Sequence, residues 1–456
     1  MKSYEMDLTN GSLWKKIWIF SVPLMFSNIL QIVFNMSDVA VVGKFSGPIA
    51  LGAVGSTSIL ITLFTGLLIG LASSVNSLTA LYIGSGDSEK IRKTVHTSFI
   101  LCLSAGLLFA GLGILLSEWI LATMNTKPEL ITYAVLYLRI YLLGMPALAL
   151  YNWGNAILNA AGDTKRPLYY LTLAGAINVV LNLFFVIVLH MGVVGVALAS
   201  VIAQYVSALL ILRLLLCTGE TFGLHIKMLS IAPEIMRKLL RIGIPSSLQY
   251  AIFAIANLFV QTSVNSFDHV MVEGNSAAAN ADPLVYDMMA AFYTACSSFI
   301  AQNYGAGKRN RILKSYLISL LYSFLLGLLL GVGLYMARYP FLSLFTNDIS
   351  VVDAGIMRLS VMAFSYGISA FMDCTIAASR GLGKTIIPTV IVIMGSCVFR
   401  VVWIYTIFAY FGTIQSLYLL YSVSWSLTAI AEITYFLWIY RRSILINPLP
   451  PQTIIH

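Results

Sequence analysis

The stretch from Phe99 to Ser117 reads FILCLSAGLLFAGLGILLS and contains no charged side chain. As an α-helix, which rises 1.5 Å per residue, it would be about 28 Å long, close to the ~30 Å hydrocarbon core of a bilayer. Such a stretch is typical of a helix that crosses a membrane. Similar stretches recur along the chain, and we predict twelve spans, at 14–43, 50–82, 95–118, 131–160, 168–190, 193–217, 235–265, 274–303, 315–337, 354–379, 386–410 and 413–440.

The composition of the whole chain indicates an all-α integral membrane protein. Of its 456 residues, 59% are hydrophobic and only 10% are charged. A water-soluble domain carries about 25% charged residues, because most of its surface faces water. Most of the outer surface of this protein is therefore expected to face lipid.

The basic residues are distributed unequally between the two sides of the predicted spans. If the N-terminus lies in the cytoplasm, 21 Lys and Arg fall in cytoplasmic segments, and three, Lys44, Lys127 and Arg338, fall on the other side. Cytoplasmic loops of membrane proteins carry an excess of Lys and Arg. We therefore expect a multi-pass protein of the cytoplasmic (inner) membrane with both termini in the cytoplasm. The net charge of +9 is spread over these loops, so no nucleic-acid partner is expected.

The second half of the chain repeats the first. The loop GSGDSEKIRK at 84–93 falls on GAGKRNRILK at 305–314. Further matching pairs, in chain order, are Lys16 with Lys238, Pro23 with Pro245, Asn35 with Asn257, Gly162 with Gly383, Thr164 with Thr385, and Pro167 with Pro388. The separation within the first three of these pairs is one residue longer than within the last three. Several matches in the same order indicate an internal duplication.

The repeat predicts two pseudo-symmetric lobes of six helices each around a central cleft. We expect an N-terminal lobe over 1–216, a cytoplasmic linker over 217–241 and a C-terminal lobe over 242–456. Six spans are an even number, so both lobes start on the same side and should be related by an axis along the membrane normal. Pro23 and Pro245 should kink the first helix of each lobe.

Motifs of enzymes and metal sites are absent from the sequence. The five cysteines form no C-x-x-C pair, the five histidines make no ligand cluster, and no G-x-S-x-G, Walker A or H-E-x-x-H motif occurs. We therefore expect no enzymatic activity, no metal site and no cofactor.

The first span contains a narrow polar seam. Four polar residues share about 80° of its circumference: Asn28, Gln31, Asn35 and Asp38. A charged side chain at membrane depth costs at least ~2.5–3.5 kcal/mol, so it normally faces a cavity or a partner. Asn178 and Asn182, one helical turn apart in the span 168–190, offer one such partner surface. The seam either binds an ion or a substrate, or only joins helices by hydrogen bonds.

The second half has its own ionisable residues at membrane depth: Asp282, Asp287, Asp373, Arg400 and Glu432. Asp373 and Arg400 have opposite charges in neighbouring spans, which allows an ion pair between them. Arg139 and Arg358 lie near the outer ends of their spans, where long basic side chains can reach the interface.

Three stretches resemble the multidrug and toxic compound extrusion (MATE) family. They are PLMFSNILQIVFNMSD at 23–38, followed by Val42-Gly43, then QNYGAG at 302–307 and SRGLGK at 379–384. The resemblance runs from about residue 12 to 440, with the motifs in the family's order. It implies two six-helix lobes, a cleft that opens to one side or the other, and drug export driven by inward H⁺ or Na⁺.

The resemblance also implies a cation site in the first lobe. Asp38 matches the acidic coupling residue of the family's first helix, and Asn178 matches an asparagine near it in the fifth helix. Asn182 falls where some members carry a second aspartate. This chain would therefore have one carboxylate fewer in that lobe.

In the second lobe the resemblance is incomplete. Asp373 is similar to an aspartate in the tenth helix of some bacterial members. The glutamate that those members carry in the seventh helix has no counterpart here, where the span offers Gln249, Asn257 and Gln261. A sodium site of that kind is not expected.

The residues and the resemblance together predict a cation-coupled antiporter that exports drugs or other amphipathic, often cationic, small molecules by alternating access. The expected cation-coupling residues are Asp38, Asn178, Asn182 and Asn35, and the expected cleft residues are Gln31, Asn28, Asn257 and Asp373. With one carboxylate in the first lobe, H⁺ is favoured over Na⁺. A monomer in the bilayer is expected. The alternative is a lipid-linked oligosaccharide flippase of the same superfamily, which would need a more basic cavity.

Overall fold

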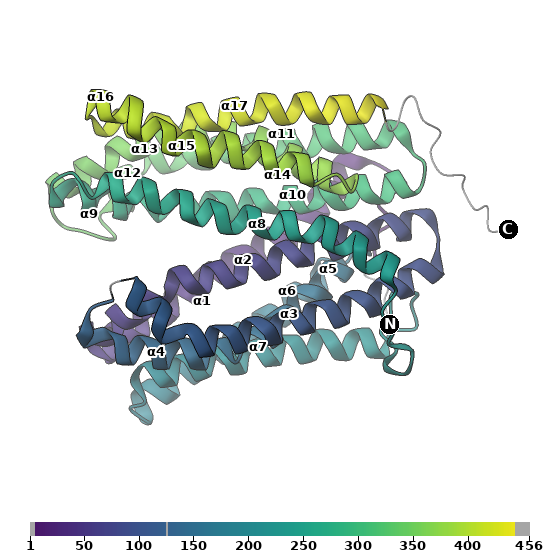
Figure 1. Cartoon of the computed structure of the whole chain (residues 1–456), viewed down its shortest axis with the longest axis horizontal. Helices are drawn as coiled ribbons and strands as arrows, with labels where there is room; N and C mark the ends of the chain where they lie inside the picture. The colour runs from purple at the N-terminus through teal and green to yellow at the C-terminus, as the bar shows by residue number, and fades with distance from the viewer. Residues whose placement is uncertain (1–4, 125, 443–456) are drawn as a thin grey trace. The chain divides into compact units, whose positions relative to one another are not determined.

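The computed structural model describes residues 5–124 and 126–442, and these ranges are helical, without a β-strand (Figure 1). The elements are α1 (Leu13–Phe45), α2 (Gly47–Ser85), α3 (Ser88–Thr123), α4 (Pro128–Leu142), α5 (Met145–Ala160), α6 (Lys165–Leu183), η1 (Phe184–Val188), α7 (Gly192–Cys217), η2 (Ile226–Met228), α8 (Pro233–Val264), α9 (His269–Ala279), α10 (Ala281–Gly305), α11 (Arg309–Met336), α12 (Arg338–Leu342), α13 (Ile349–Gly381), α14 (Ile386–Val392), η3 (Ile393–Val398), α15 (Phe399–Trp403), η4 (Ile404–Phe408), α16 (Ala409–Phe411) and α17 (Ile414–Tyr440).

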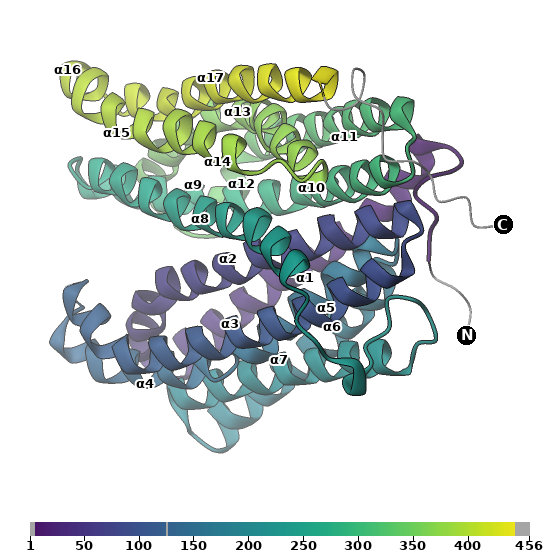
Figure 2. The same ribbon diagram turned by 45° about the vertical axis from the view of Figure 1, so that its right-hand side comes forward.

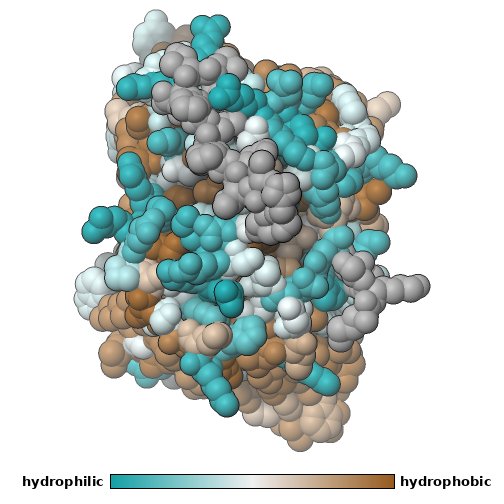
Figure 3. Space-filling model, turned by 90° about the vertical axis from the view of Figure 1, so that its right-hand side faces the viewer, coloured by the Kyte–Doolittle hydropathy of each residue, from teal (hydrophilic) through white to brown (hydrophobic). Residues whose placement is uncertain are grey.

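These helices confirm the predicted membrane fold. Within the described residues, ten helices are long and apolar enough to cross a bilayer, and the pair α4–α5, bent by 43°, makes an eleventh. α17 has 27 residues, which is about 40 Å of helix and long enough to cross as well. Figure 3 views the ends of the helices, where hydrophilic side chains gather, while hydrophobic side chains cover the flanks.

The chain folds into two compact units, and two helices contribute to both. Unit 1 comprises Phe26–Ser247 with the described residues before Leu8, and unit 2 comprises Leu8–Met25 and the chain from Leu248 onward. α1 and α8 therefore begin in one unit and end in the other (Figure 2). Each changes unit two residues after its proline, Pro23 or Pro245. The predicted lobe boundaries at 216 and 242 did not include this exchange.

Unit 2 holds the stretch Leu8–Met25 through specific contacts. Asn303 donates to the carbonyl of Leu8 at 3.1 Å, and Lys308 Nζ donates to the carbonyl of Thr9 at 2.9 Å. Phe20 packs edge-on against Phe299, with ring centroids 5.6 Å apart. These contacts are why the first part of α1 belongs to unit 2.

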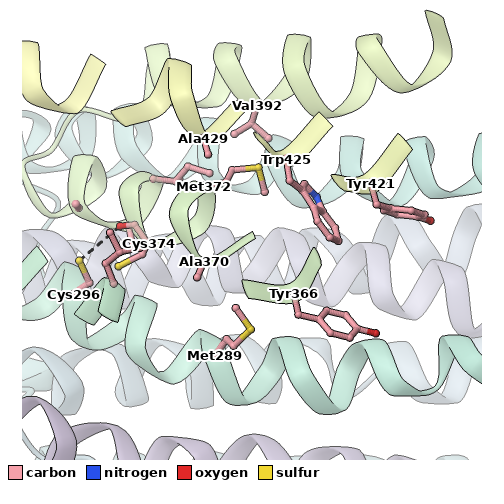
Figure 4. Close-up of a cluster of buried hydrophobic side chains, with 14 of the residues drawn as sticks. Met289, Cys296, Tyr366, Ala370, Met372, Cys374, Val392, Tyr421, Trp425 and Ala429 are labelled. Atoms are coloured by element: carbon pink, nitrogen blue, oxygen red, sulfur yellow. Dashed lines mark hydrogen bonds between the residues drawn. The ribbon is translucent and has the colours of Figure 1, made fainter. Parts of the chain in front are cut away.

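α13 is central to unit 2, where it packs against α9, α10, α11 and α17. Glycines allow the close approach: a Cβ on Gly331 of α11 would lie 2.1 Å from the carbonyl oxygen of Ala363. Helices in membranes pack closely through such small residues. Figure 4 shows part of the hydrophobic cluster around this helix, with Tyr366, Tyr421 and Trp425 at one end of it.

The repeat is visible in the backbone. Gly86 and Gly307, at matching positions of the repeated loop, both have φ near +70°, and both precede a helix N-cap. Further on, His190 (φ 52°) and Gly412 (φ 59°) follow the ends of η1 and α16, and the separation of this pair is one residue longer. The extra residue falls between the matches at Gly383 and Gly412, a stretch that contains two π-helical segments, η3 and η4, where unit 1 has one, η1. A π-helical turn accommodates one residue more than an α-helical turn, which explains the change of separation.

The two repeated loops end in different caps. Asp87 is the N-cap of α3, and its side chain accepts a hydrogen bond from the backbone N–H of Lys90 at 3.0 Å. The matching N-cap of α11 is Lys308, whose side chain makes no cap bond. Lys308 Nζ instead donates to Asn10 Oδ1 at 2.6 Å. The backbone turn is shared, whereas the side chain serves a different purpose in each unit.

Candidate functional site: a carboxylate network in unit 1

Three helices of unit 1 bring a carboxylate and its hydrogen-bond partners together. Asp38 lies in the second half of α1, and its Oδ2 accepts from Ser200 Oγ of α7 at 2.8 Å. Asn182 Nδ2 of α6 donates to the other oxygen, Oδ1. Asn178, one turn earlier in α6, donates to Ser200 Oγ at 3.3 Å and accepts from Asn182 at 3.2 Å. The four side chains form a closed network.

The partners of Asp38 are buried more deeply than Asp38 itself. Asn182 is 0% exposed and Ser200 is 6% exposed, while Asp38 is half-buried. Asn182 Oδ1 is buried without a hydrogen-bond partner. A buried polar atom without a partner is costly, so this oxygen is available to a bound ion or water.

The network contains three of the four residues predicted for cation coupling. Asp38, Asn178 and Asn182 are brought together, whereas Asn35 lies exposed on α1 and takes no part in the network. The coupling roles themselves stay predictions. Among the residues predicted to line a cleft, Gln31 is exposed and Asn28 is half-buried.

Sequence reasoning missed Ser200. It lies in the apolar helix α7 among small residues, in the run VALASVIAQ at 196–204. A lone serine in such a helix is common, because small residues favour close packing of helices in lipid. Only the helix rotation, which is seen in the structure, shows that its hydroxyl points at Asp38.

Unit 2 contains a buried ion pair that the sequence did not predict. Arg358 of α13, 4% exposed, donates from Nη2 to Asp282 Oδ2 of α10 at 2.5 Å. Tyr366 donates to the other oxygen of Asp282 at 2.6 Å, and Arg358 Nη1 donates to Asn275 Oδ1 at 2.9 Å. The expectation that Arg358 reaches the membrane interface is therefore wrong, because the guanidinium has a carboxylate partner inside the unit.

The expected ion pair between Asp373 and Arg400 is absent from the described residues. Arg400 donates from Nη1 to Asn257 Oδ1 at 3.0 Å, and the two charged groups interact only at longer range. Asp373 is half-buried and Asn257 is exposed. Glu432 is 0% exposed, and neither of its carboxylate oxygens has a hydrogen-bond partner.

An ionisable group held at membrane depth inside a duplicated bundle of spanning helices is the arrangement of a secondary transporter. The MatE family matches this chain over 23–184 and again over 245–406. The two matched segments start at the two prolines paired by the repeat, Pro23 and Pro245. The chain belongs to the MATE family of multidrug efflux transporters.

Known proteins of this family resemble the chain over most of its length. A probable multidrug resistance protein, YpnP of Bacillus subtilis, is 28% identical over 68% of this chain and 69% of its own. An FAD transporter of Shewanella oneidensis is 24% identical over 76% of this chain and 77% of its own. Among solved structures, a MOP superfamily transporter from Pyrococcus furiosus is 25% identical over 98% of both chains, with a TM-score of 0.89.

Proposed function

We propose that the protein is a cation-coupled antiporter that exports amphipathic small molecules, with Asp38 as the coupling residue. The observation that supports this most directly is the network of Asp38, Asn182, Ser200 and Asn178 in unit 1. A carboxylate at membrane depth is costly unless it is protonated, bound to a cation or paired. A proton, a metal ion and a cationic substrate are therefore alternative occupants of one site.

The hydrogen bonds indicate how the network can take up a proton. Asn182 Nδ2 can only donate, so it fits Oδ1 in either state of Asp38. Ser200 Oγ can donate or accept. It donates to Oδ2 when Asp38 is ionised, and it can accept from Oδ2 once a proton is bound there. The serine hydroxyl therefore allows Asp38 to change charge without losing a partner.

The coupling ion in this proposal is H⁺ rather than Na⁺. A sodium site needs several oxygen ligands, and here both carboxylate oxygens face N–H or O–H donors. The amide oxygen of Asn178 already accepts from Asn182, so the amide oxygen of Asn182 is the one open acceptor among these four side chains, fewer than a sodium shell requires. A proton needs only the carboxylate and a hydroxyl that can reverse its bond.

Efflux from proteoliposomes tests the coupling ion. Purified protein is reconstituted with a fluorescent cationic dye, and a pH gradient is imposed without sodium, then a sodium gradient without a pH difference. Efflux should follow the pH gradient and should be lost in Asp38→Asn. Efflux that requires the sodium gradient and ignores pH would contradict proton coupling.

The proposal includes an orientation with both termini in the cytoplasm. A single engineered cysteine at Lys227, which lies in η2 between α7 and α8, should resist an impermeant thiol reagent added outside intact cells. Labelling there from outside would reverse the orientation. The relatives reported above are named as multidrug or small-molecule transporters, so the comparisons do not favour the flippase alternative.

A further inference from the structure

We propose that unit 2 carries an anion site at Arg400, which binds the carboxylate or phosphate group of a substrate that also has an aromatic ring. This inference rests on the proposed function, because it names a substrate class for the transporter. The carboxylate and the phosphate share one chemistry: a planar guanidinium binds either through paired N–H bonds.

Arg400 is a buried cation without a close countercharge. Its side chain is 2% exposed, and no carboxylate lies within ion-pair distance of it in the described part of the chain. One hydrogen bond, to Asn257, is formed, and Nε is buried without a partner. A buried guanidinium normally has an anionic partner, because removing it from water is costly. Arg358 of the same unit has such a partner in Asp282.

Aromatic rings surround the guanidinium. The Arg400 Cζ atom lies 4.7 Å from the centroid of Tyr421, 5.8 Å from Trp425 and 5.9 Å from Phe253. Figure 4 shows Tyr421 and Trp425 at one end of the cluster in unit 2. Ring faces attract a cation but leave its N–H groups without acceptors. The same rings can stack on the aromatic part of a ligand whose anionic group satisfies those N–H groups.

In the repeat, the region around Arg400 corresponds to the carboxylate network of unit 1. A separation of 222 residues, which holds at Pro23 and Pro245 and again at His190 and Gly412, places Arg400 on Asn178 and Asn257 on Asn35. The residue that corresponds to Asp38 is Val260, which is buried. The negative charge of unit 1 therefore has a neutral counterpart in unit 2, and the positive charge of Arg400 stands where unit 1 has the neutral Asn178, so the region as a whole is negative in one unit and positive in the other. A duplicated site whose charge has changed sign should prefer ligand groups of the opposite charge.

The helix around Arg400 is irregular, which is a further indication of a functional site. Arg400 lies in the five-residue helix α15, between the π-helical segments η3 and η4. Segments of π-helix inside α-helices occur frequently at functional sites. Only one such segment, η1, is found in the matching part of unit 1.

A ligand can reach the guanidinium by replacing one neutral bond. Asn257, the hydrogen-bond acceptor of Arg400, is exposed on α8. An anionic group that arrives at Asn257 needs to displace only its amide oxygen, and it replaces a neutral acceptor by a charged one. The new acceptor adds attraction between opposite charges and can accept two parallel N–H bonds from the guanidinium.

Binding to the purified protein tests the site without any ion gradient. Flavin mononucleotide is compared with riboflavin, which has the same ring system and no phosphate, and indole-3-acetate is compared with its neutral amide. Isothermal titration calorimetry should show the anion of at least one pair binding about 10-fold more tightly than its neutral analogue, a difference of about 1.4 kcal/mol, because only the anion brings a charged acceptor to the guanidinium. The two pairs distinguish a phosphate from a carboxylate.

Three variants test the assignment to Arg400. In Arg400→Gln the preference for the anion should disappear while the neutral analogue binds as before. Asp373→Asn removes a negative charge that acts on Arg400 at longer range, so anion affinity should rise there. The matched control is Asp282→Asn/Arg358→Gln, which neutralises a paired arginine and should leave the preference unchanged.

Two results would overturn the proposal. One is equal affinity of the anion and its neutral analogue in both pairs, including the absence of measurable binding. The other is an equal loss of affinity for both ligands in Arg400→Gln, which would mean that Arg400 has only a structural role. If Arg400→Gln does not fold, an unchanged anion affinity in Asp373→Asn would overturn the proposal instead. The anion preference should persist in Asp38→Asn, so this test and the coupling test fail separately.

Discussion

The two units share the kinks and turns of their backbones and differ in their polar side chains at membrane depth. Both have a first helix that changes unit after a proline, and both have a glycine with positive φ before a matching helix, α3 in unit 1 and α11 in unit 2. In unit 1 the charge at membrane depth is Asp38, held by neutral donors. In unit 2 the equivalent position is Val260, and the ionisable groups at membrane depth include an Asp282–Arg358 pair and a separate Arg400. Turns and kinks restrict the backbone directly, whereas side chains on the same framework can take up a different role.

The largest difference between the units should appear when Asp38 of unit 1 and Asp373 of unit 2 are each neutralised. Asp38→Asn keeps the size of the side chain and removes its titratable charge, so dye efflux should fall to near background with expression intact. Asp373→Asn should retain most of its efflux, because in the described part of the chain no cation lies within ion-pair distance of Asp373, and Arg380 and Arg400 act on it only at longer range. Efflux from proteoliposomes at matched protein density measures both. Normal efflux in Asp38→Asn together with its loss in Asp373→Asn would assign coupling to unit 2.

Stability should respond most strongly in unit 2. Removal of one member of a buried ion pair leaves an uncompensated charge and typically costs about 3–5 kcal/mol. Arg358→Gln and Asp282→Asn should therefore each lower the melting temperature in detergent, Asp282→Asn by more, because the Arg358 side chain that it leaves unpaired is 5% exposed, whereas Asp282 is 25% exposed. The double variant should recover part of the loss. Additive losses would show that the pair does not couple energetically.

A smaller effect is expected from the partner that sequence reasoning missed. Ser200→Ala leaves Asp38 Oδ2 without its donor and Asn178 without its acceptor, at a cost of about 1–3 kcal/mol. Efflux should fall by about 10-fold, and Ser200→Thr, which keeps the hydroxyl, should restore most of it. The control is Ser207→Ala, since that hydroxyl bonds only to the backbone of its own helix. Equal efflux in Ser200→Ala and wild type would remove Ser200 from the network.

The smallest effect is expected at the helix cap of α3, Asp87, which has no counterpart in the matching cap of α11. Asp87→Ala should destabilise the protein by about 1 kcal/mol through loss of the α3 cap. The hydrogen bond and charge of Lys90 and the backbone N–H groups hold the pKa of Asp87 below its usual value. Its contribution is therefore complete at neutral pH and is lost as the pH falls below about 4. Thermal melts of wild type and variant should converge in acid. A difference that grows in acid would exclude the cap.

The sequence predicted the spans and the repeat because both depend on patterns along one chain. The uncharged run from Phe99 to Ser117 lies within α3, and Asp38, Asn178 and Asn182 meet as expected. The pairing of Arg358 with Asp282 joins residues 76 apart, and it depends on how two helices are rotated about their axes. The same holds for Ser200. Helix rotation is set by packing against neighbours, which hydropathy and spacing do not determine.

The exchange of helix starts between the units has a consequence for any attempt to divide the chain. A cut in the segment between α7 and α8 would yield two polypeptides of six spans each, which look complete by span count. Neither could rebuild a unit alone: Leu8–Met25 belongs to unit 2 although it precedes the helices of unit 1, and the part of α8 up to Ser247 belongs to unit 1 although it follows the cut. Co-expressed fragments would have to assemble together, each supplying a helix segment to the unit of the other. An ancestor made of two identical half-length chains would, for the same reason, have been an obligate domain-swapped dimer.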